Sequence, residues 1–280
     1  MDLEFNNCRC FYLTAIVLSI LRTGVAFMSD ALKEFLNYTE SYKQYGEKVL
    51  LKIRHTVRVR DLCIEISDSL GLSGDDTALA AACGLLHDIG RFEQWKQYQT
   101  FNDQRSVDHG ALGAEVLCAD GLIGRFSETD HGTILNAVKY HNRFMLPDAL
   151  NARDRLFAGI VRDADKIDIL RLYVTGGLVC RTKGTAMSDP VLGALSECRA
   201  IQRESLNTKA DEIAIRLGFV FGLNHRRSFE IVRENDYIGR MIDVQLSETA
   251  NETLKAQLEA LKPRIRRYVD IRSLDRSAAD

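Results

Sequence analysis

A histidine and an aspartate stand side by side in the string GLLHDIG at residues 84–90, at the end of an apolar, alanine-rich run. These are His87 and Asp88, and three further histidines, His55, His109 and His141, lie upstream and downstream. Imidazole and carboxylate groups are the ligand types of borderline or hard divalent metals. A metal held by such groups can activate water toward phosphorus. The spacing therefore indicates metal-dependent hydrolysis of a phosphate ester, but it does not identify the ester.

A further carboxylate is expected from the string RDADKID at residues 162–168. Asp163 and Asp165 each fall in an apolar stripe at helical spacing, so periodicity does not decide which of them faces the histidines. Asp168 is placed to support a ligand by a hydrogen bond. Both Asp163 and Asp165 remain candidates on the pattern alone.

Helices must position these side chains. His55 shares an apolar stripe with Val59 and Leu62, so it should face inward. Neighbouring helical positions diverge by about 100°, but the backbone can turn at a helix end, where His87 and Asp88 can reach one ion. Apolar patterns predict helices over about 31–36, 47–70, 77–86, 109–117, 133–140 and 151–174, with capping residues at Ser29 or Asp30, Ser73 to Asp76, Asp108 and Asn151.

The segment 91–108 is polar and aromatic, and we expect it to form a loop over the site rather than a core element. Gly90 can take the conformation that ends the preceding helix. The structural alternative for the segment is a solvated connection with a few packed aromatic residues.

The composition predicts a mainly helical protein. Proline is scarce, at 3 of 280 residues, and 46% of the residues are hydrophobic, which is enough to fill a core. The formal net charge is -2 and no long basic run is present, which argues against duplex nucleic acid as a general partner. A single nucleotide needs only a local positive pocket. The 7 cysteines include no CxxC pair and indicate reduced thiols.

Residues 1–28 are expected to form an N-terminal extension. The apolar run 11–21 is shorter than the roughly 20 residues that cross a bilayer, and Asp2 and Glu4 stand where a signal peptide carries positive charge. A weak signal or anchor, and a helix packed on the domain, are the alternatives. Met28 offers a natural start, so residues 1–28 need not belong to the functional protein. We expect a cytoplasmic protein without stable membrane insertion.

The remainder of the chain, residues 181–280, also has helical patterns, including amphipathic segments at 210–217 and 247–261. We expect these helices to pack on the domain formed by residues 29–180. His131 and His225 belong to no pattern and are expected at the surface.

The chain resembles the HD superfamily of metal-dependent phosphohydrolases. The signature is His55, then His87-Asp88, then a later aspartate, and the string LHDIG matches closely. The resemblance spans roughly residues 50–170, a little under half of the chain, and it is specific for the superfamily but not for the substrate. It implies an all-α, HD-domain helical bundle with additional C-terminal helices.

The resemblance also implies that His55, His87, Asp88 and the later aspartate bind a divalent metal, with metal-activated water attacking phosphorus. The last ligand of the family typically follows a small residue, as Asp165 follows an alanine. On this ground Asp165 is the first choice and Asp163 the second.

His109 and His141 resemble the extra ligands of family members that bind two metals. The alternative is one metal, with both histidines contacting phosphate or transferring protons. The expected cofactor is one or two divalent ions per chain, from Mn, Co, Ni, Mg, Zn or Fe.

Charged residues beside the ligands are candidates for substrate contacts and proton transfer. The candidate phosphate-binding cations are Arg91, Arg105, Arg143 and Lys166. A structural salt bridge is the alternative for each of them. Asp88 is expected to serve in catalysis as well as metal binding, and Glu93 is a candidate general acid or base. The alternative for Glu93 is a solvated loop carboxylate.

The favoured interpretation is a phosphohydrolase acting on a nucleotide or another small phosphate ester. A di-iron oxygenase of the HD type would use similar ligands, and iron content with oxygen-dependent turnover would distinguish it. A non-catalytic HD-fold regulatory or binding module would be expected to lose ligands, whereas every signature position is present. The GYP element of the cyclic-dinucleotide branch is absent, which disfavours that activity. Homo-oligomerisation is left open.

Overall fold

The computed structural model describes residues 26–179, 182 and 184–275, which form helices and no strand. The all-α prediction is therefore confirmed. The helices are α2 (Ala26–Glu40), η1 (Lys43–Tyr45), α3 (Glu47–Ser69), α4 (Gly74–Leu86), α5 (Ile89–Tyr98), η2 (Asp103–Arg105), α6 (His109–Ala119), η3 (Leu122–Arg125), α7 (Glu128–Tyr140), α8 (Ala152–Val174), α9 (Asp189–Ser196), η4 (Arg203–Ser205), α10 (Asp211–Leu217), η5 (Gly218–Gly222), α11 (Arg226–Glu234), α12 (Tyr237–Glu248) and α13 (Glu252–Leu274). The expectations for residues 1–25 lie outside the described residues.

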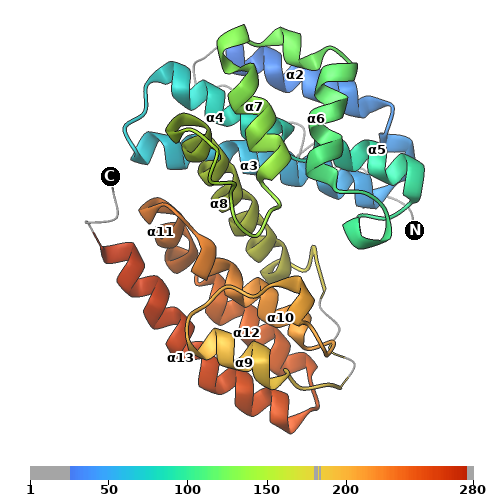
Figure 1. Ribbon diagram of the computed structural model, residues 1–280. Helices are drawn as coiled ribbons and strands as arrows, with labels where there is room; N and C mark the ends of the chain where they lie inside the picture. The colour runs from blue at the N-terminus through green and yellow to red at the C-terminus, as the bar shows by residue number, and fades with distance from the viewer. Residues whose placement is uncertain (1–25, 180–181, 183, 276–280) are drawn as a thin grey trace, which may run out of the picture.

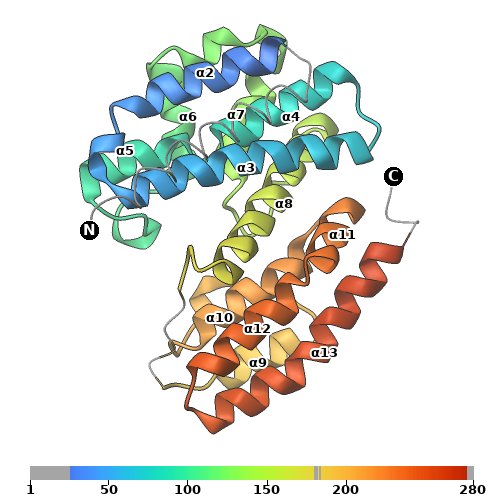
Figure 2. The same ribbon diagram turned by 180° about the vertical axis from the view of Figure 1, so that it is seen from behind.

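Helix α8 joins two groups of helices (Figure 1). It contacts α3, α4 and α7 of the first group, and α11 and α12 of the second. The view from behind shows α3 alongside α4, and α13 along the outer side of the second group (Figure 2). One hydrophobic cluster of buried side chains extends from Leu32 to Val269 and includes residues of both groups. The division of the chain near residue 180 stays a prediction.

Three predicted capping residues start helices as expected. The side chain of Ser73 accepts a hydrogen bond from the amide of Asp76 at 3.1 Å, and Asn151 accepts from the amide of Asp154 at 2.8 Å. Asp108 caps α6 in the same way, with 3.0 Å to the amide of Ala111. Each cap satisfies an amide that the first helical turn leaves without a partner. These caps fix where α4, α6 and α8 begin.

Other helix ends differ from the sequence prediction. The described part of helix α2 spans Ala26–Glu40, so Ser29 and Asp30 lie inside the helix rather than at its start. Helix α7 begins at Glu128 rather than near Thr133. The segment 247–261 is not one helix, because the side chain of Asn251 accepts from the amide of Leu254 at 2.8 Å and starts α13 anew.

The prediction of a loop over residues 91–108 is wrong for residues 91–98, because these residues belong to helix α5, which spans Ile89–Tyr98. Ile89, Phe92 and Trp95 recur at a spacing of three and are buried, so this face packs on the core. The ring of Phe92 lies 5.9 Å from that of Phe35. Phe92 and Trp95 are therefore core residues, whereas Tyr98 at the end of α5 is 43% exposed.

Gly90 does not end a helix, because it lies inside the first turn of α5. A Cβ atom at this position would lie 2.3 Å from the carbonyl oxygen of His109 and 2.6 Å from the amide nitrogen of Gly113. Glycine is required here because α5 and α6 approach each other through their backbones. This contact holds the start of α6 against the residues that follow His87.

Two expectations from composition can be compared with the described residues. Cys63 and Cys83 are free and buried, Cys118 is free and exposed, and Cys198 is free and partly buried. None of the described helices combines the length and the apolar character that a bilayer crossing requires. Cys8, Cys10 and Cys180 lie outside the described residues.

A buried carboxylate organises the connection into the second group of helices. Asp211 is inaccessible to solvent. It accepts hydrogen bonds from the amides of Ser188, Asn207 and Thr208, each at 2.8 Å. Burial alone would raise the pKa of Asp211, but these amide donors stabilise the charged form, and its pKa is lowered. The carboxylate thus joins the start of α9 to the turn that precedes α10.

The substitution Asp211→Asn should lower the free energy of unfolding by about 1–3 kcal/mol at pH 7, because it leaves buried amide donors without an anionic acceptor. A carboxyl with a lowered folded-state pKa stabilises the protein above its unfolded pKa of about 3.9, and this contribution is lost as the pH falls through the folded-state pKa. The difference between parent and variant should therefore shrink in acid.

Urea denaturation from pH 7 to pH 3 measures this difference. Glu204→Gln serves as the control, since Glu204 is exposed on η4 in the same region. An Asp211 variant as stable as the control at pH 7 would contradict the assignment.

Candidate metal centre

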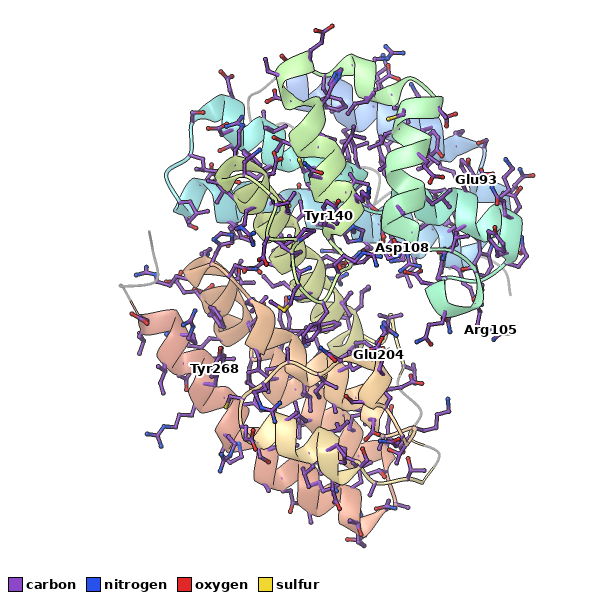
Figure 3. The ribbon with its side chains drawn as sticks, in the orientation of Figure 1. Glu93, Arg105, Asp108, Tyr140, Glu204 and Tyr268 are labelled. Carbon is purple, nitrogen blue, oxygen red and sulfur yellow. The ribbon has the colours of Figure 1, made fainter. Side chains whose placement is uncertain are left out.

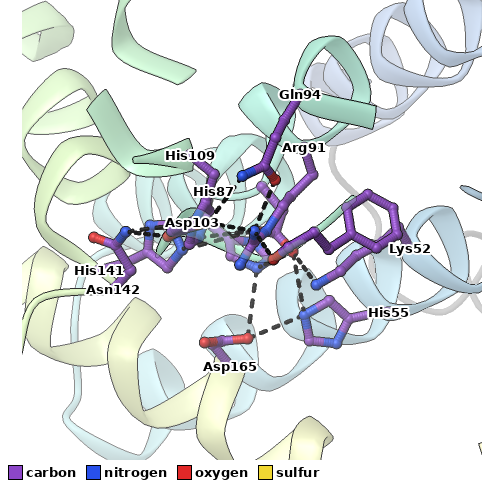
Figure 4. A network of polar contacts seen from close by, with 12 residues as sticks. Lys52, His55, His87, Arg91, Gln94, Asp103, His109, His141, Asn142 and Asp165 are labelled. Atoms are coloured by element: carbon purple, nitrogen blue, oxygen red, sulfur yellow. Dashed lines mark hydrogen bonds and ion pairs between the residues drawn. The ribbon is translucent and has the colours of Figure 1, made fainter. Parts of the chain in front are cut away.

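Four histidines from different helices meet in the first group of helices, close to α8 (Figure 4). His55 lies in the middle of α3, whereas His87 follows α4 directly. His109 is the first residue of α6, and His141 follows α7 directly. None of the four is more than 4% exposed. The sequence analysis predicted that these four histidines contribute to one site, and in the structure they lie together.

The Nδ1 atom of each imidazole faces an acceptor. These acceptors are Asp168 Oδ2 for His55 at 2.7 Å, the Gly84 carbonyl for His87 at 2.7 Å, Asp103 Oδ2 for His109 at 2.6 Å, and the Val138 carbonyl for His141 at 2.7 Å. A carbonyl or carboxylate oxygen can only accept, so Nδ1 carries the hydrogen in each ring. In a neutral imidazole, Nε2 then keeps its lone pair. Metal-binding histidines are oriented in this way.

The four Nε2 atoms point into the centre of the cluster. Those of His55 and His87 are buried and have no hydrogen-bond partner. Those of His109 and His141 lie 3.0 Å apart, although two lone pairs facing each other repel. Two nitrogens bound to one ion at about 2.0–2.1 Å are roughly 3.0–3.4 Å apart, so a shared cation fits this spacing. The donor set therefore suits a bound metal.

Asp88 lies between the two histidine pairs. It occupies the turn from α4 into α5, and its side chain is 2% exposed. Its Oδ2 atom is 3.7 Å from His55 Nε2 and 3.5 Å from His87 Nε2, while its Oδ1 atom is 3.4 Å from His109 Nε2 and 3.8 Å from His141 Nε2. Each oxygen thus faces one pair. The carboxylate would therefore be able to hold a metal together with either pair of histidines.

Asp165 completes the first pair from α8. Its Oδ1 atom lies 3.0 Å from His55 Nε2 and 3.7 Å from His87 Nε2. Two sets of residues each bring three ligand atoms together, and within each set the three atoms lie within 4.8 Å of one another. The first set is His55, His87 and Asp165, and the second is His87, Asp88 and His141. Each set could hold a metal, and His87 belongs to both sets.

Asp163 faces away from the cluster. Its carboxylate accepts hydrogen bonds from the amide of Asn224 at 2.9 Å, the amide of His225 at 2.9 Å and the hydroxyl of Ser228 at 2.7 Å. These donors lie at the start of α11, so Asp163 attaches α8 to the second group of helices. His225 was expected at the surface, but its Nε2 atom is buried beside Gly159 of α8. His131 is partly buried, with Nε2 3.0 Å from the Phe126 carbonyl.

Asp168 lies behind His55, as expected for a supporting residue. Besides the imidazole, it contacts Arg171, whose Nε donates to Oδ1 at 2.5 Å. Burial alone would raise the pKa of Asp168, but His55 and Arg171 hold it below its usual value. The charged carboxylate therefore orients the ring of His55.

The carboxyl groups at the centre are strongly biased toward their charged forms. Burial alone would raise the pKa of Asp88, but Lys52, His87 and other positive groups hold it well below its usual value. Burial alone would also raise the pKa of Asp165, but His55 and His87 hold that pKa well below its usual value. Ionised carboxylates are the form that binds metal.

The second histidine pair is biased toward the neutral form. Burial, with His109 and His87 nearby, lowers the pKa of His141 to about 3. Burial and Arg91 also lower the pKa of His109. Burial and the nearby Lys52 oppose protonation of His55 as well, but the carboxylates of Asp165 and Asp168 outweigh them and raise its pKa.

The candidate cations are placed differently from one another. Arg91 is at the centre, with Nε 3.5 Å from Asp88 Oδ1, but its Nη1 atom donates to Asp103 at 2.7 Å and to the Phe101 carbonyl at 2.7 Å. Arg143 pairs with Asp108 at 2.9 Å and is half exposed. Both therefore have protein partners, in line with the salt-bridge alternative.

Three other candidates lie apart from the cluster. Arg105 is exposed and projects from the edge of the segment after α5 (Figure 3). Lys166 donates to the Gly222 carbonyl at 2.5 Å, in the second group of helices, and burial lowers its pKa to about 8. Glu93 accepts from the hydroxyl of Tyr42 at 3.0 Å and pairs with Lys96 at 3.1 Å. Because α5 is a helix, Glu93 lies on a different face from Asp88, which removes the reason for assigning it acid–base chemistry.

Several residues of the site were missed from the sequence. The ammonium of Lys52 donates to Asp88 Oδ2 at 2.6 Å. Lys52 precedes His55 by three residues on α3, and that spacing could have revealed it. Asp103 links Arg91 to His109, and the buried amide of Gln94 donates to Asp103 at 3.0 Å. Their segment was assigned to a loop, so no periodic signal marked them.

The last missed residue is Arg162, a buried side chain of α8. It donates to the carbonyls of Tyr140 at 3.3 Å, His141 at 3.4 Å and Phe144 at 3.0 Å, and also to that of Arg143. A cation is favoured at the C-terminal end of a helix, where carbonyl oxygens lack partners. Arg162 thereby fixes the turn that carries His141.

Comparisons with known proteins agree with the cluster. Residues 53–170 match the family described as HD domain. Ribonuclease Y of Thermus thermophilus is 30% identical over 151 residues, which are 54% of this chain and 21% of that protein. Ribonuclease Y of Rhodopirellula baltica is 30% identical over 119 residues, 42% of this chain and 19% of that protein. The chain thus spans about a fifth of the length of these curated relatives. No solved structure matches at a significant level.

The two aspartates of α8 provide a matched test. Asp165→Asn should weaken metal binding by more than the roughly 10- to 100-fold that loss of a supporting residue costs. Asp163→Asn should leave metal affinity unchanged but lower the free energy of unfolding by about 1–3 kcal/mol, since buried donors lose their acceptor. Calorimetric titration with Mn²⁺ and urea denaturation measure the two effects. Equal losses of metal affinity in both variants would contradict this division of roles.

Proposed function

We propose that the protein is a metal-dependent phosphohydrolase whose centre is the histidine–aspartate cluster, in line with the match of residues 53–170 to the HD domain family. The observation that carries the proposal is the convergence of four histidine Nε2 atoms around one carboxylate, that of Asp88. A divalent metal bound by this set supplies Lewis acidity and an activated water.

The proposed ligands divide into two groups that share Asp88. His55, His87 and Asp165 lie on one side, and His109 and His141 on the other. Asp168 and Asp103 keep the hydrogen on Nδ1 of His55 and His109, so that Nε2 remains free to bind. Two divalent ions per chain are the favoured stoichiometry. The donor set accommodates several divalent ions, among them Mn, Co, Ni, Mg, Zn and Fe.

The positive groups at the centre define a place for the phosphoryl oxygens. The ammonium of Lys52 and the guanidinium of Arg91 both lie beside Asp88. Lys52 is partly exposed, at 22%, and has three donors, of which Asp88 takes one. It can therefore donate to a phosphoryl oxygen while it contacts Asp88. Fixed positive groups beside the reacting phosphorus stabilise charge that develops there.

A small phosphate ester is the favoured substrate. The cations near the centre are mostly paired with carboxylates, as Arg91 is with Asp103 and Arg143 with Asp108. Such a surface offers little unpaired charge for a long polyanion. The curated relatives carry the name Ribonuclease Y, and this name makes an RNA phosphodiester the second candidate substrate.

We expect phosphate release from nucleotides or small phosphate esters when Mn²⁺, Co²⁺, Ni²⁺ or Mg²⁺ is supplied, and cleavage of a single-stranded RNA oligonucleotide if the second candidate holds. The substitution Asp88→Ala should reduce turnover by at least about 100-fold, because it removes the carboxylate shared by both ligand groups. Steady-state kinetics over a panel of monoesters, diesters and RNA measure this.

The control for this experiment is Glu93→Gln, which should keep parental activity because Glu93 contacts Tyr42 and Lys96 rather than the cluster. Folded, metal-loaded protein that turns over no ester would disprove the hydrolase proposal. Oxygen-dependent turnover by an iron-loaded sample would then favour the oxygenase, and its absence the non-catalytic module.

The stoichiometry is tested separately. His109→Ala and His141→Ala should each lower bound metal from two equivalents toward one, because each removes a ligand from one side of Asp88 only. Metal content after dialysis, measured by atomic emission beside Glu93→Gln, gives the result. A ligand role for these two histidines would be ruled out by parental metal content in both variants.

A further inference from the structure

Two large apolar side chains are exposed directly after a residue of the centre. Phe144 is 47% exposed and Met145 is 73% exposed, and they follow His141 by three and four residues. Most large apolar side chains of the described residues are buried. An exposed adjacent pair beside a reactive centre is a feature of binding surfaces.

The backbone that carries this pair is held firmly. Arg162, which is 7% exposed, donates to the carbonyl of Phe144 at 3.0 Å. Asn142 donates to Asp108 Oδ1 at 3.0 Å, and Arg143 pairs with Asp108 Oδ2 at 2.9 Å. The turn is therefore attached to α8 by one residue and to the start of α6 by two. A surface fixed in this way binds a ligand at a lower entropic cost.

The pair also lies close to the proposed metal ligands. Three residues span at most about 11 Å of extended chain, which limits the distance from His141 to Phe144. Arg162 and Asp165 are three residues apart on α8, so they lie on the same face one turn apart. Arg162 holds the Phe144 carbonyl while Asp165 contacts His55. The exposed pair is thus within the reach of one nucleotide whose phosphate is at the centre.

We propose that Phe144 and Met145 form a binding surface for the nucleobase of the substrate, and hence that this site acts on a nucleotide. The inference rests on the proposed phosphohydrolase function. A nucleobase is flat and largely apolar on its faces, and it stacks on an aromatic ring without requiring a given base. The thioether of Met145 is polarisable and adapts to such a ring. A sugar phosphate or an inorganic phosphate offers nothing for this surface to contact.

Two phosphate monoesters test the inference, because AMP and ribose 5-phosphate both carry a phosphate on the 5-position of ribose but only AMP carries a nucleobase. With AMP as substrate, Phe144→Ala should lower kcat/KM by about 5- to 150-fold, which is the range that base stacking supplies. With ribose 5-phosphate, the same substitution should leave kcat/KM unchanged. Phe144→Tyr should retain activity on AMP. Tyr98→Ala is the matched control, because Tyr98 is a 43% exposed aromatic residue at the end of α5.

A binding measurement separates the two proposals. Calorimetric titration with adenosine, guanosine, cytidine and uridine should show binding to the parent and loss of binding in Phe144→Ala. If the parent hydrolyses neither ester, the phosphohydrolase proposal fails, and the nucleoside titration still decides the base-binding surface. Equal effects of Phe144→Ala on both esters, or nucleoside binding that survives the substitution, would overturn the inference. A change of sedimentation mass in Phe144→Ala without loss of nucleoside binding would assign the pair to contact with a second copy of the chain.

Discussion

The burial of the Asp88 carboxylate is the constraint on which the centre depends. A charge taken out of water costs several kcal/mol unless positive groups or a metal face it. Lys52 and Arg91 face it directly, and two pairs of imidazole rings surround its oxygens. None of these groups is adjacent to Asp88 in the chain except His87. The centre therefore requires α3, α5, α6 and the end of α7 to meet at one point, and the hydrophobic cluster that these helices share holds them there.

Helix ends supply most of the side chains at that point. His87, Asp88, His109 and His141 all lie where a helix begins or ends, whereas His55 and Asp165 come from the middle of long helices. A helix end lets the backbone change direction, but it also leaves amides and carbonyls without partners. Asp108 satisfies an amide at the start of α6, and Arg162 satisfies carbonyls after α7. These two residues thus fix the backbone that carries His109 and His141, while Asp103 and the Val138 carbonyl orient the two rings.

Much of this arrangement follows from the sequence, and the exceptions have physical reasons. The stripe on α3 placed His55 inward, and capping residues located the starts of α4, α6 and α8, because both signals are local. The choice between Asp163 and Asp165 could not be made from periodicity, because α8 is covered by other helices on both sides and each aspartate faces one of them. The segment after Gly90 was assigned to a loop because its few apolar residues, Phe92 and Trp95, sit among polar ones. Contacts between residues far apart in the sequence, such as that of Lys52 with Asp88, depend on how the helices pack. Local sequence patterns do not contain that information.

The contact between Gly90 and α6 has a consequence for design. Grafting the histidines and aspartates onto another helical bundle would reproduce the ligand types but not their spacing, because the spacing comes from two helix backbones in direct contact. A methyl group at position 90 would act as a wedge 2.3 Å from the carbonyl of His109. Such a wedge would separate His109 from Asp88 while leaving every ligand in the sequence. A scaffold search for this centre should therefore begin from the bare backbone contact and treat the ligands as the second requirement.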